Sequence, residues 1–404
     1  MAENAFYPAD ILIPASADMT KWSVVACDQF SSDRDYWERV KAFVGGAPST
    51  LKLIVPEAYL EDGDTEARAA AIAREMDEYL SSDLFRTLDS SYVYVERTLE
   101  SGAVRRGLVG VLDLEKYDYA PGSRTAIRAS EGTIVSRLPA RIKVRRGAKL
   151  ELPHIMALIN DRIKTVIEPL AGEKLPLLYD FDLMEGGGHI RGFQVTGAAA
   201  ERTAAALMRL AEASDVQVIM GDGNHSLAAA KGFWDEIKGS LPDGERETHP
   251  ARFALVELNN VYDPAIEFEA IHRAVFGVDA AAFADALAAL DSQSGQWPVR
   301  CRTAAGDREL RVEADTIGGL IGKVQEFIDG YLEANGGAVD YIHGEAEVLA
   351  LGERDNAAGI VLPAMGKSDF FATVESGGAF PRKSFSIGHA REKRYYLECR
   401  RITK

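Results

Sequence analysis

The sequence has few cysteines and no pattern that joins them. Its 404 residues include three, Cys27, Cys301 and Cys399, which lie far apart and form no CxxC pair. Such a set builds neither a disulfide framework nor a zinc site of the usual spacing. We interpret Cys27, which follows the apolar residues VVA, as a small buried hydrophobic residue rather than a nucleophile.

Long apolar segments are also missing. No run reaches the roughly 18 residues that a membrane-spanning helix needs. The first residues, MAENAFYPADILIP, lack the basic start and the apolar stretch of a signal peptide. We therefore expect a cytoplasmic protein that does not bind membranes.

Positive charge is scarce as well. The chain has 46 basic and 62 acidic residues, a formal net charge of −16. This balance argues against generic binding to nucleic acid or to an anionic membrane, and the sequence has no helix-turn-helix signature. A hydrophobic content of 47% falls within the range of soluble globular proteins, and we expect a small-molecule substrate. The sequence leaves a homo-oligomer open.

The length and the pattern of elements predict an α+β protein with two domains. We expect a core domain over 1–275, a smaller α+β domain over 276–365, and a segment over 366–404 that returns to the core because its last strand is too apolar to stand alone. Hydrophobic periodicity predicts helices at 32–45, 63–85, 153–172, 199–214, 226–238, 278–290 and 316–336. It predicts strands or hairpins at 9–15, 21–28, 49–60, 91–117, 175–197, 215–220, 251–263, 297–314, 345–353 and 357–365.

The stretch VQVIMGDGNHSLAAAK places polar residues between an apolar strand and a helix. The first N–H groups of a helix lack partners inside it, and the helix dipole adds positive charge there, so this turn is suited to bind a phosphate. Gly221 and Gly223 let the backbone approach a ligand, while Asp222 and His225 form a potential acid/base pair or a metal ligand with a base. The alternative is structural: Asn224 or Ser226 caps the helix, and the glycines make the turn.

A second cluster, RASEGTIVSRLPARIKVRRG, gathers basic residues in an otherwise acidic chain. Guanidinium groups bind phosphate in bidentate fashion, and hydroxyl groups complete such a shell. We therefore predict a phosphate site here, with Ser130, Glu131 and Thr133 in the loop. The alternative is a solvated strand face whose arginines pair with surface carboxylates. The basic residues are Arg124, Arg128, Arg137, Arg141, Lys143, Arg145 and Arg146.

Other polar groups are interpreted as structural. Arg382, Lys383 and His389 lie in a compact polar group near the C-terminal end of the sequence, which we expect to form a loop and a charged turn. His272 and His154 are expected to have structural rather than functional roles.

Four stretches together resemble the family DUF1015: GDGNHSLAAAK, RASEGTIVSRLPARIK, FEAIHRAVF and PRKSFSIGHAREKRYYLE. The resemblance extends over most of the chain, from WSVVACDQF onward. The usual turn of the family reads Asp-Gly-His-His-Arg. This sequence keeps Asp222, Gly223 and His225 but has Asn224 and Ser226 where His and Arg would stand. With that arginine absent, backbone N–H groups and the segment from Arg128 to Lys143 would have to hold the phosphate.

The family's turn is similar to the nucleotide-phosphate turn of the ParB/sulfiredoxin fold, which includes kinases that act on free serine. The resemblance implies a mixed-sheet core of that kind and an enzyme that uses ATP or ADP with Mg²⁺. An acidic residue near the transferred group would activate the acceptor hydroxyl. Glu131 and Asp222 are the candidates; which is the base and which the metal ligand is open.

Two functions follow as hypotheses. The first is phosphoryl transfer to or from a small hydroxylated metabolite such as serine, and the second is a regulator that binds a nucleotide or metabolite without turnover. Asp222 and His225 favour the enzyme, whereas the missing arginine favours the regulator. The predicted catalytic residues are Asp222, His225 and Glu131, Asp222 is also the predicted metal ligand, and the predicted cofactor-binding residues are Gly221, Gly223, Asn224, Ser226, Arg128, Thr133, Arg141 and Lys143.

Overall fold

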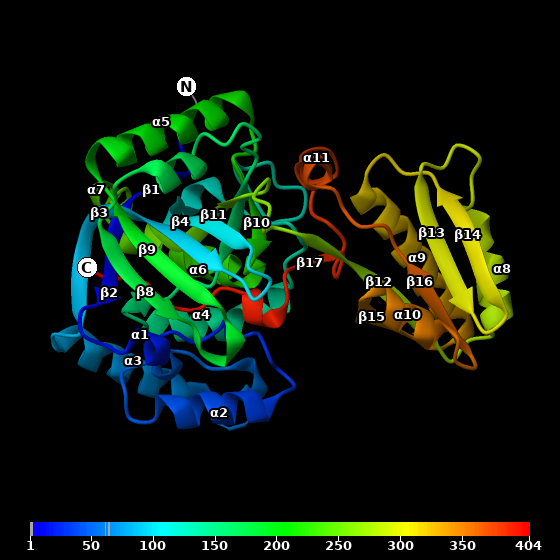
Figure 1. The fold of residues 1–404 in the computed structure, drawn as a ribbon, viewed down its shortest axis with the longest axis horizontal. Coiled ribbons are helices and arrows are strands. Elements are labelled where there is room, and N and C mark those ends of the chain that lie inside the picture. The colour runs from blue at the N-terminus through cyan, green and yellow to red at the C-terminus, as the bar shows by residue number, and fades with distance from the viewer. Residues whose placement is uncertain (1–2, 61, 64) are drawn as a thin grey trace. The chain divides into compact units, whose positions relative to one another are not determined.

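The computed structural model describes residues 3–60, 62–63 and 65–404. The chain divides into two compact units (Figure 1). Unit 1 comprises 1–129, 133–266 and 389–404, and unit 2 comprises 130–132 and 267–388. Within the described residues, every helix is too short or too polar to cross a membrane.

Unit 1 contains two sheets: a ten-stranded mixed sheet, and a two-stranded sheet that consists of β6 and β18. The order of the large sheet is β5-β10-β7-β11-β4-β3-β9-β8, with β1 beside β4 and β2 beside β3. The pairs β5–β10 and β7–β11 are parallel, and the other pairs are antiparallel. The strands are β1 (Phe6–Tyr7), β2 (Ala9–Pro14), β3 (Phe85–Thr98), β4 (Val104–Asp113), β5 (Ile127–Arg128), β6 (Leu150–Glu151), β7 (Met156–Ile159), β8 (Leu177–Asp182), β9 (His189–Val195), β10 (Val218–Asp222), β11 (Phe253–Asn260) and β18 (Arg400–Arg401).

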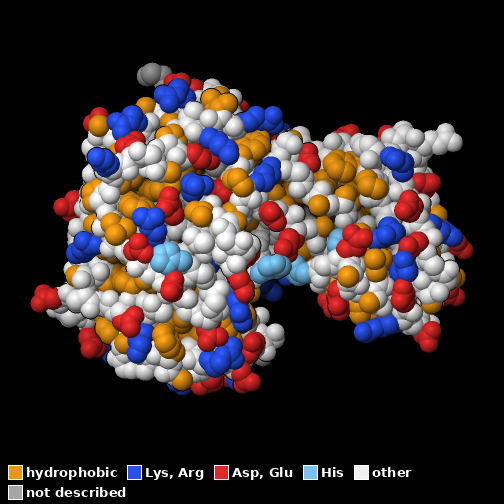
Figure 2. Space-filling view, in the orientation of Figure 1, with side chains coloured by type: hydrophobic (Ala, Val, Ile, Leu, Met, Phe, Trp, Pro, Cys, Tyr) orange, Lys and Arg blue, Asp and Glu red, His pale blue; other side chains and the backbone are white. Residues whose placement is uncertain are grey.

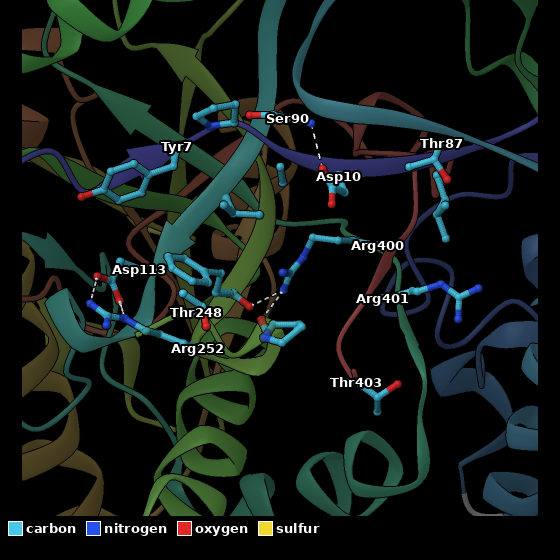
Figure 3. A pocket seen from close by; sticks show the side chains of 16 residues that line it. Tyr7, Asp10, Thr87, Ser90, Asp113, Thr248, Arg252, Arg400, Arg401 and Thr403 are labelled. Atoms are coloured by element: carbon cyan, nitrogen blue, oxygen red, sulfur yellow. Dashed lines mark hydrogen bonds and ion pairs between the residues drawn. The ribbon is translucent and has the colours of Figure 1, made fainter. Parts of the chain in front are cut away.

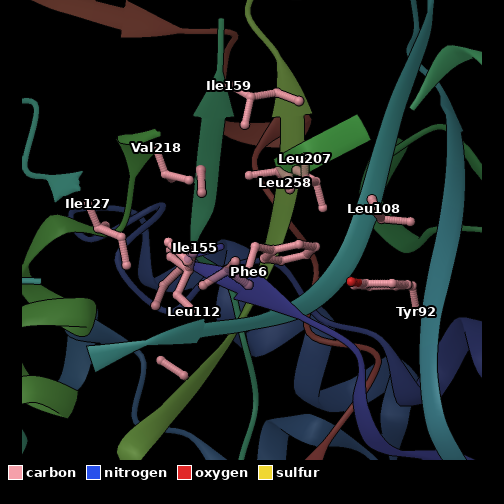
Figure 4. Packing of buried hydrophobic residues seen from close by; sticks show 14 of the residues in the cluster. Phe6, Tyr92, Leu108, Leu112, Ile127, Ile155, Ile159, Leu207, Val218 and Leu258 are labelled. Atoms are coloured by element: carbon pink, nitrogen blue, oxygen red, sulfur yellow. The ribbon is translucent and has the colours of Figure 1, made fainter. Parts of the chain in front are cut away.

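Helices cover both faces of the large sheet because its central strands alternate between two apolar layers. Tyr92 and Tyr94 of β3 belong to one cluster of buried residues, and Val93 and Val95 belong to another. The first cluster, shown in Figure 4, receives side chains from α5 and α6, and the second receives side chains from α2. The sheet is therefore the middle of three layers. The helices of unit 1 are α1 (Met19–Trp22), α2 (Arg34–Val44), α3 (Thr65–Ser81), α4 (Leu138–Gly147), α5 (Gly197–Ala213), α6 (Asn224–Lys238) and α7 (Asp243–Arg246).

Unit 2 is a second α+β unit with an antiparallel six-stranded sheet in the order β14-β13-β16-β12-β15, where β17 also pairs with β12. A cluster of phenylalanines fills part of its interior: the rings of Phe268 and Phe370 are stacked, and that of Phe385 meets both edge to face. Its elements are β12 (Phe268–Phe276), α8 (Ala280–Leu287), β13 (Trp297–Thr303), β14 (Gly306–Val312), α9 (Ile317–Asn335), β15 (Ala338–His343), α10 (Glu345–Gly352), β16 (Ala357–Val361), α11 (Lys367–Gly377) and β17 (Phe385–Ile387).

The predicted α+β class with a mixed sheet is confirmed. The bounds of the two compact units differ from those of the three expected segments. The second unit begins earlier than expected, because β12 begins at Phe268, before the change in composition near 275, and pairs with β15 and β16 of unit 2. Residues 130–132 also belong to unit 2, through the bridge from Glu131 to Phe380. The division at 275 and 365 therefore does not follow the contacts.

Three local predictions are wrong. The helix expected over 153–172 is instead the strand β7 followed by turns and a 3-10 helix, η5 (Glu168–Gly172). All four residues of β7 are buried, and the strand lies between β10 and β11. Its sequence therefore lacks the alternation of polar and apolar residues that would indicate a strand. The strand expected over 49–60 consists of 3-10 helices, η1 (Thr50–Leu53) and η2 (Glu57–Tyr59), and the strand expected over 345–353 is the helix α10.

Charged side chains of both signs are interspersed on the face shown in Figure 2. Several basic side chains of unit 1 pair with carboxylates, as Arg34 does with Asp62 and Arg39 does with Glu185. Positive charge is therefore compensated locally, which is consistent with the acidic balance of the whole chain.

Candidate functional site

The stretch GDGNHS is the strand-to-helix turn that the sequence predicts. Strand β10 ends at Asp222 and helix α6 begins at Asn224. The register between β10 and β7 shifts between Met220 and Asp222, so the ladder is irregular at Gly221. Asp222 is the last residue of β10, which lies between β5 and β7 in the sheet.

Gly223 is required at this turn for two reasons. Its φ of 81° lies in the left-handed region, where residues with a Cβ are strained. A Cβ at this position would also lie 3.0 Å from Cγ1 of Ile155. Gly223 is itself the N-cap residue, so the structural alternative, in which Asn224 or Ser226 is the cap, is not realised.

Both carboxylate oxygens of Asp222 have partners in unit 1. Oδ1 accepts a hydrogen bond from the Gly223 N–H at 2.8 Å, and Oδ2 lies 3.2 Å from Nζ of Lys393. Burial opposes ionisation of Asp222, but the positive charges of Lys393 and His154 and the two hydrogen bonds outweigh it, so the pKa of Asp222 lies below its usual value. Asp222 is therefore a fixed anion at neutral pH.

The backbone amides of the turn are partly used inside it. The Gly223 N–H binds the carboxylate of Asp222, and the Ser226 N–H donates to the carbonyl of Gly223 at 3.0 Å. The expectation that the backbone of this turn binds a phosphate stays a prediction.

His225 connects the turn to the segment that contains Thr133. Its Nε2 accepts a hydrogen bond from the Ile134 N–H at 3.2 Å. A ring nitrogen that accepts a hydrogen bond carries no proton, so this contact favours neutral His225 with the proton on Nδ1. The hydroxyl of Thr133 is buried close to the phenol of Tyr117.

The basic segment lies beside β10 and α6, the elements on either side of the turn, but its charges are largely paired; whether it shares a phosphate site with the turn stays a prediction. Strand β5, which ends at Arg128, pairs with β10, and helix α4 packs against α6. Residues 138–147 form a helix, not a strand face. The structural alternative nevertheless describes its ion pairs: Arg141 with Glu57, Lys143 with Glu66 at 3.4 Å, Arg145 with Glu151 at 2.5 Å and Arg146 with Glu236 at 2.8 Å.

Glu131 belongs to unit 2, whereas the other predicted site residues belong to unit 1. Within unit 2, its negative charge favours the protonated form of Arg273, whose pKa burial lowers to about 10. The catalytic role of Glu131 stays a prediction.

Sequence reasoning missed a chain of hydrogen bonds behind the turn. The Oγ of Ser226 lies 3.1 Å from Nε2 of His154, and Nδ1 of His154 lies 2.9 Å from the hydroxyl of Tyr396. The Cys27 N–H donates to the same hydroxyl at 3.3 Å. We interpreted His154 as structural from the sequence, because nothing near it in the chain shows that it meets the GDGNHS turn. Burial, together with the charge of Asp28, raises the pKa of Cys27 to about 12, which agrees with an unreactive thiol.

Lys393 is the second residue that the sequence analysis missed, and buried arginines hold its backbone. Arg97 donates to the carbonyls of Lys393 and Arg391, each at 2.6 Å, and Arg105 donates to the carbonyl of Glu392 at 2.8 Å. Burial lowers the pKa of Arg97 to about 9, with a further contribution from the nearby charge of Arg105. The signal was available, since Lys393 lies in the stretch HAREKRYYLE that carries part of the resemblance.

The described residues contain no group of three or more His, Cys, Asp or Glu side chains arranged to hold a metal ion. Asp222 offers one carboxylate, and both of its oxygens are engaged. These residues do not fit a resident metal ion held by the protein alone. The assignment of Asp222 as a metal ligand stays a prediction.

Unit 1 also contains an open groove of about 810 Å³, shown in Figure 3. Its lining carries both charge signs: Arg252 pairs with Asp113 at 2.7 Å, and Arg400 donates to the carbonyl of Phe253 at 2.6 Å. Among the described residues, those predicted for the site do not line this groove. Two of its three lining arginines, Arg252 and Arg400, are already engaged by protein groups.

Three solved structures are similar to parts of this chain. SbnI with a C-terminal truncation, from Staphylococcus aureus, has a TM-score of 0.36 at 10% identity, over 69% of this chain and 82% of that one. A conserved hypothetical protein from Pyrococcus furiosus has a TM-score of 0.34 at 12% identity, over 72% and 94%. Free serine kinase in complex with AMP has a TM-score of 0.37 at 12% identity, over 72% and 91%.

No curated protein matches the chain in sequence. The family model described as "Protein of unknown function (DUF1015)" matches residues 8–356, which is most of the chain. The match includes the GDGNHS turn and the basic segment on which the resemblance was based. The chain therefore belongs to the DUF1015 family.

Proposed function

We propose that unit 1 binds a nucleoside di- or triphosphate at the start of α6 and transfers a phosphoryl group between the nucleotide and a small hydroxylated metabolite such as serine. The observation that carries this proposal is the ion pair between Asp222 and Lys393 at a strand-to-helix turn in which Gly223 is the N-cap residue of α6. The turn supplies a helix N-terminus, and Lys393 supplies the cation that the turn itself lacks.

Lys393 takes the place of the arginine that is usual in the family's turn. A terminal phosphate carries about two negative charges, so backbone amides alone neutralise it incompletely. The side chain of Lys393 is 12% exposed and that of Asp222 is 23% exposed, so a ligand has access to the pair. In the proposal, the ammonium group of Lys393 remains beside Asp222 and also contacts the phosphate.

Asp222 is suited to hold Lys393 rather than to accept a proton. A general base works best when its pKa lies near the working pH, whereas the pKa of Asp222 is lowered. In the proposal, the proton of the substrate hydroxyl passes to Nε2 of neutral His225, where the hydroxyl replaces the Ile134 N–H as the hydrogen-bond donor. The hydroxyl oxygen forms a bond to the terminal phosphorus, the bond from that phosphorus to the bridging oxygen breaks, and the shortened nucleotide leaves.

Mg²⁺ enters this scheme only with the nucleotide, since nucleotide sites hold it largely through substrate phosphates and water. When bound there, the ion would neutralise part of the charge on the phosphates. The protein's contribution is to position the phosphates and to hold Lys393 and His225 beside them.

The test compares the wild type with Asp222→Asn, which keeps the size of the side chain but removes its charge. Formation of ADP from ATP with serine and other small hydroxylated metabolites is expected to fall by about 10² or more, because the anchor of Lys393 is lost. Asp113→Asn is the matched control, since it also removes a buried, ion-paired carboxylate of unit 1. Both variants are assayed at temperatures equally far below their melting points. Equal turnover in the wild type and Asp222→Asn would contradict the proposal.

The second candidate is a regulator that binds the nucleotide without turnover. The paired cations of α4 favour it, because they leave little positive charge to stabilise a transferring phosphoryl group. A regulator is identified by nucleotide binding that depends on Lys393 but yields no ADP with any acceptor in the panel.

A further inference from the structure

A second cavity of unit 1 lies behind the GDGNHS turn. Its volume is about 260 Å³, and α3, α4, α6, β11 and the segments around η1 and β6 enclose it. Most of its lining is aliphatic, and small residues create much of the space. Five alanines line it: Ala140, Ala148, Ala229, Ala230 and Ala254.

The inner wall of this cavity is buried and apolar. Ala229, Ala230 and Ala254 are between 1% and 4% exposed, and Leu150 and Leu255 are equally buried. Protein interiors are normally packed as closely as organic crystals, so a space of this size lined by small side chains is unusual for a finished core. Such a wall suits the apolar part of a ligand.

The mouth of the cavity is polar and carries a positive excess. Leu60, which lines it, is 45% exposed and marks the solvent side, and Arg68 and Arg141 are partly exposed there. Among the described residues, three arginines and two glutamates line the cavity, a formal excess of one positive charge. The third arginine is Arg145, and the glutamates are Glu57 and Glu151.

Arg68 is bound differently from the other two lining arginines. Arg141 pairs with Glu57, and Arg145 pairs with Glu151. Among its described neighbours, Arg68 instead donates to the backbone carbonyls of Tyr59 and Asp62. Carbonyl groups fix the orientation of a guanidinium group but do not neutralise its charge. Part of that charge acts on the carboxylate of Asp62, which itself pairs with Arg34, and in the proposal below the charge also meets an anion.

We propose that this cavity is a binding site for a small aliphatic carboxylate, whose chain fills the alanine-lined space and whose carboxylate meets Arg68 at the mouth. The volume of about 260 Å³ has room for a short aliphatic chain, and hexanoate is the probe chosen for it.

The site is independent of the nucleotide but shares a wall with the proposed phosphate site. Ser226, His154 and Tyr396 line the cavity and form the hydrogen-bonded chain behind the turn. Binding is therefore measured in the absence of nucleotide. If hexanoate binds while ADP formation is absent, the cavity site stands and the proposed function fails. If ADP forms but hexanoate does not bind, the proposed function stands and the cavity site fails.

The first experiment uses the full wild-type chain and three probes of equal length. Titration calorimetry compares hexanoate, hexanol and hexylamine. Hexanoate is expected to bind at least about tenfold more tightly than hexanol, because a charge-assisted hydrogen bond to Arg68 is added, and hexylamine is expected not to bind. Equal binding of hexanoate and hexylamine would overturn the proposal.

The second experiment changes the cavity. Arg68→Met is expected to weaken hexanoate binding about tenfold and to leave hexanol unchanged, with Arg209→Met on the exposed face of α5 as the control. Ala229→Leu fills the cavity and is expected to abolish binding of both, with Ala205→Leu on α5 as the matched control. If Ala229→Leu does not fold, Ala148→Leu fills the same space from the end of α4. Unchanged hexanoate binding in a folded, cavity-filled variant would refute the site.

Discussion

Unit 1 contains two clusters of ionic groups that share a chain segment but differ in access to solvent. In the first, Lys393 lies against Asp222, with side chains 12% and 23% exposed. In the second, the next residue, Arg394, lies between Glu257 and Glu398, and all three side chains are at most 3% exposed. We call the pair of Lys393 and Asp222 the open cluster, and Arg394 with Glu257 and Glu398 the closed cluster.

The comparison separates ion pairs that hold the fold from those that are available to a ligand. The closed cluster is shielded from solvent: its carboxylates pair with Arg394 and accept hydrogen bonds from the amide of Asn259 and the phenol of Tyr179. The open cluster lies at a helix N-terminus with a glycine corner. Ion pairing alone therefore does not identify a functional site; access and nearby donor groups do.

The largest expected effect comes from breaking the closed cluster. Arg394→Met removes the cation and leaves Glu257 and Glu398 buried without it, which is expected to lower the free energy of unfolding by about 3–5 kcal/mol. Urea unfolding of the full chain measures this change, with Arg209→Met as an exposed control expected to stay within about 0.5 kcal/mol. A loss below about 1 kcal/mol would remove the distinction between the clusters.

Breaking the open cluster is expected to give the opposite pattern. Lys393→Met should lower the free energy of unfolding by less than Arg394→Met does, because the side chains of Lys393 and Asp222 are 12% and 23% exposed whereas those of the closed cluster are at most 3% exposed. Nucleotide affinity or turnover should fall by about 10-fold to 100-fold, because the cation that meets the phosphate is lost.

Lys231→Met is the matched control for this prediction. Lys231 is a similarly buried lysine, 11% exposed, that pairs with Asp235 at 3.1 Å on α6. Its loss should leave nucleotide affinity unchanged. If both lysine variants weakened nucleotide binding equally, the effect would reflect general charge and not the contact with Asp222.

The smallest expected effect is on stability in acid. The folded-state pKa of Asp222 is lowered, so its stabilising contribution is present above the unfolded pKa of about 3.8 and is lost as the pH falls through the folded value. The melting temperature of the wild type should therefore exceed that of Asp222→Asn slightly at pH 7, and the difference should shrink below about pH 4. A difference that grew in acid would show that the pKa of Asp222 is raised.

The sequence predicts the elements of the site better than the elements around it. The pattern of an apolar run, two glycines and helix-forming residues located β10 and α6 correctly because the signals are local. The strand β7 was predicted as a helix because a four-residue, fully buried strand has no alternation to distinguish it. Its identity depends on β10 and β11, which pair with it from distant parts of the chain.

The partners of the turn could not be predicted for the same reason. Asp222 is recognisable from its position, but Lys393 and His154 reach it only through the folded sheet and the buried arginines that hold residues 391–394. The paired cations of α4 illustrate the converse error. Sequence clustering indicated free positive charge, whereas the carboxylates that neutralise it come from other elements, among them η2 for Arg141 and α6 for Arg146.

Unit 1 is discontinuous in sequence, so its parts are synthesised at different times. Residues 389–404 belong to unit 1 but follow the whole of unit 2 in the chain, so the ribosome produces Lys393 and Tyr396 only after unit 2 has been synthesised. Until then, Asp222 and His154 stand without these two partners. The nascent chain therefore holds an incomplete unit 1 throughout the synthesis of unit 2, and a product that stops in unit 2 lacks the cation of the proposed site.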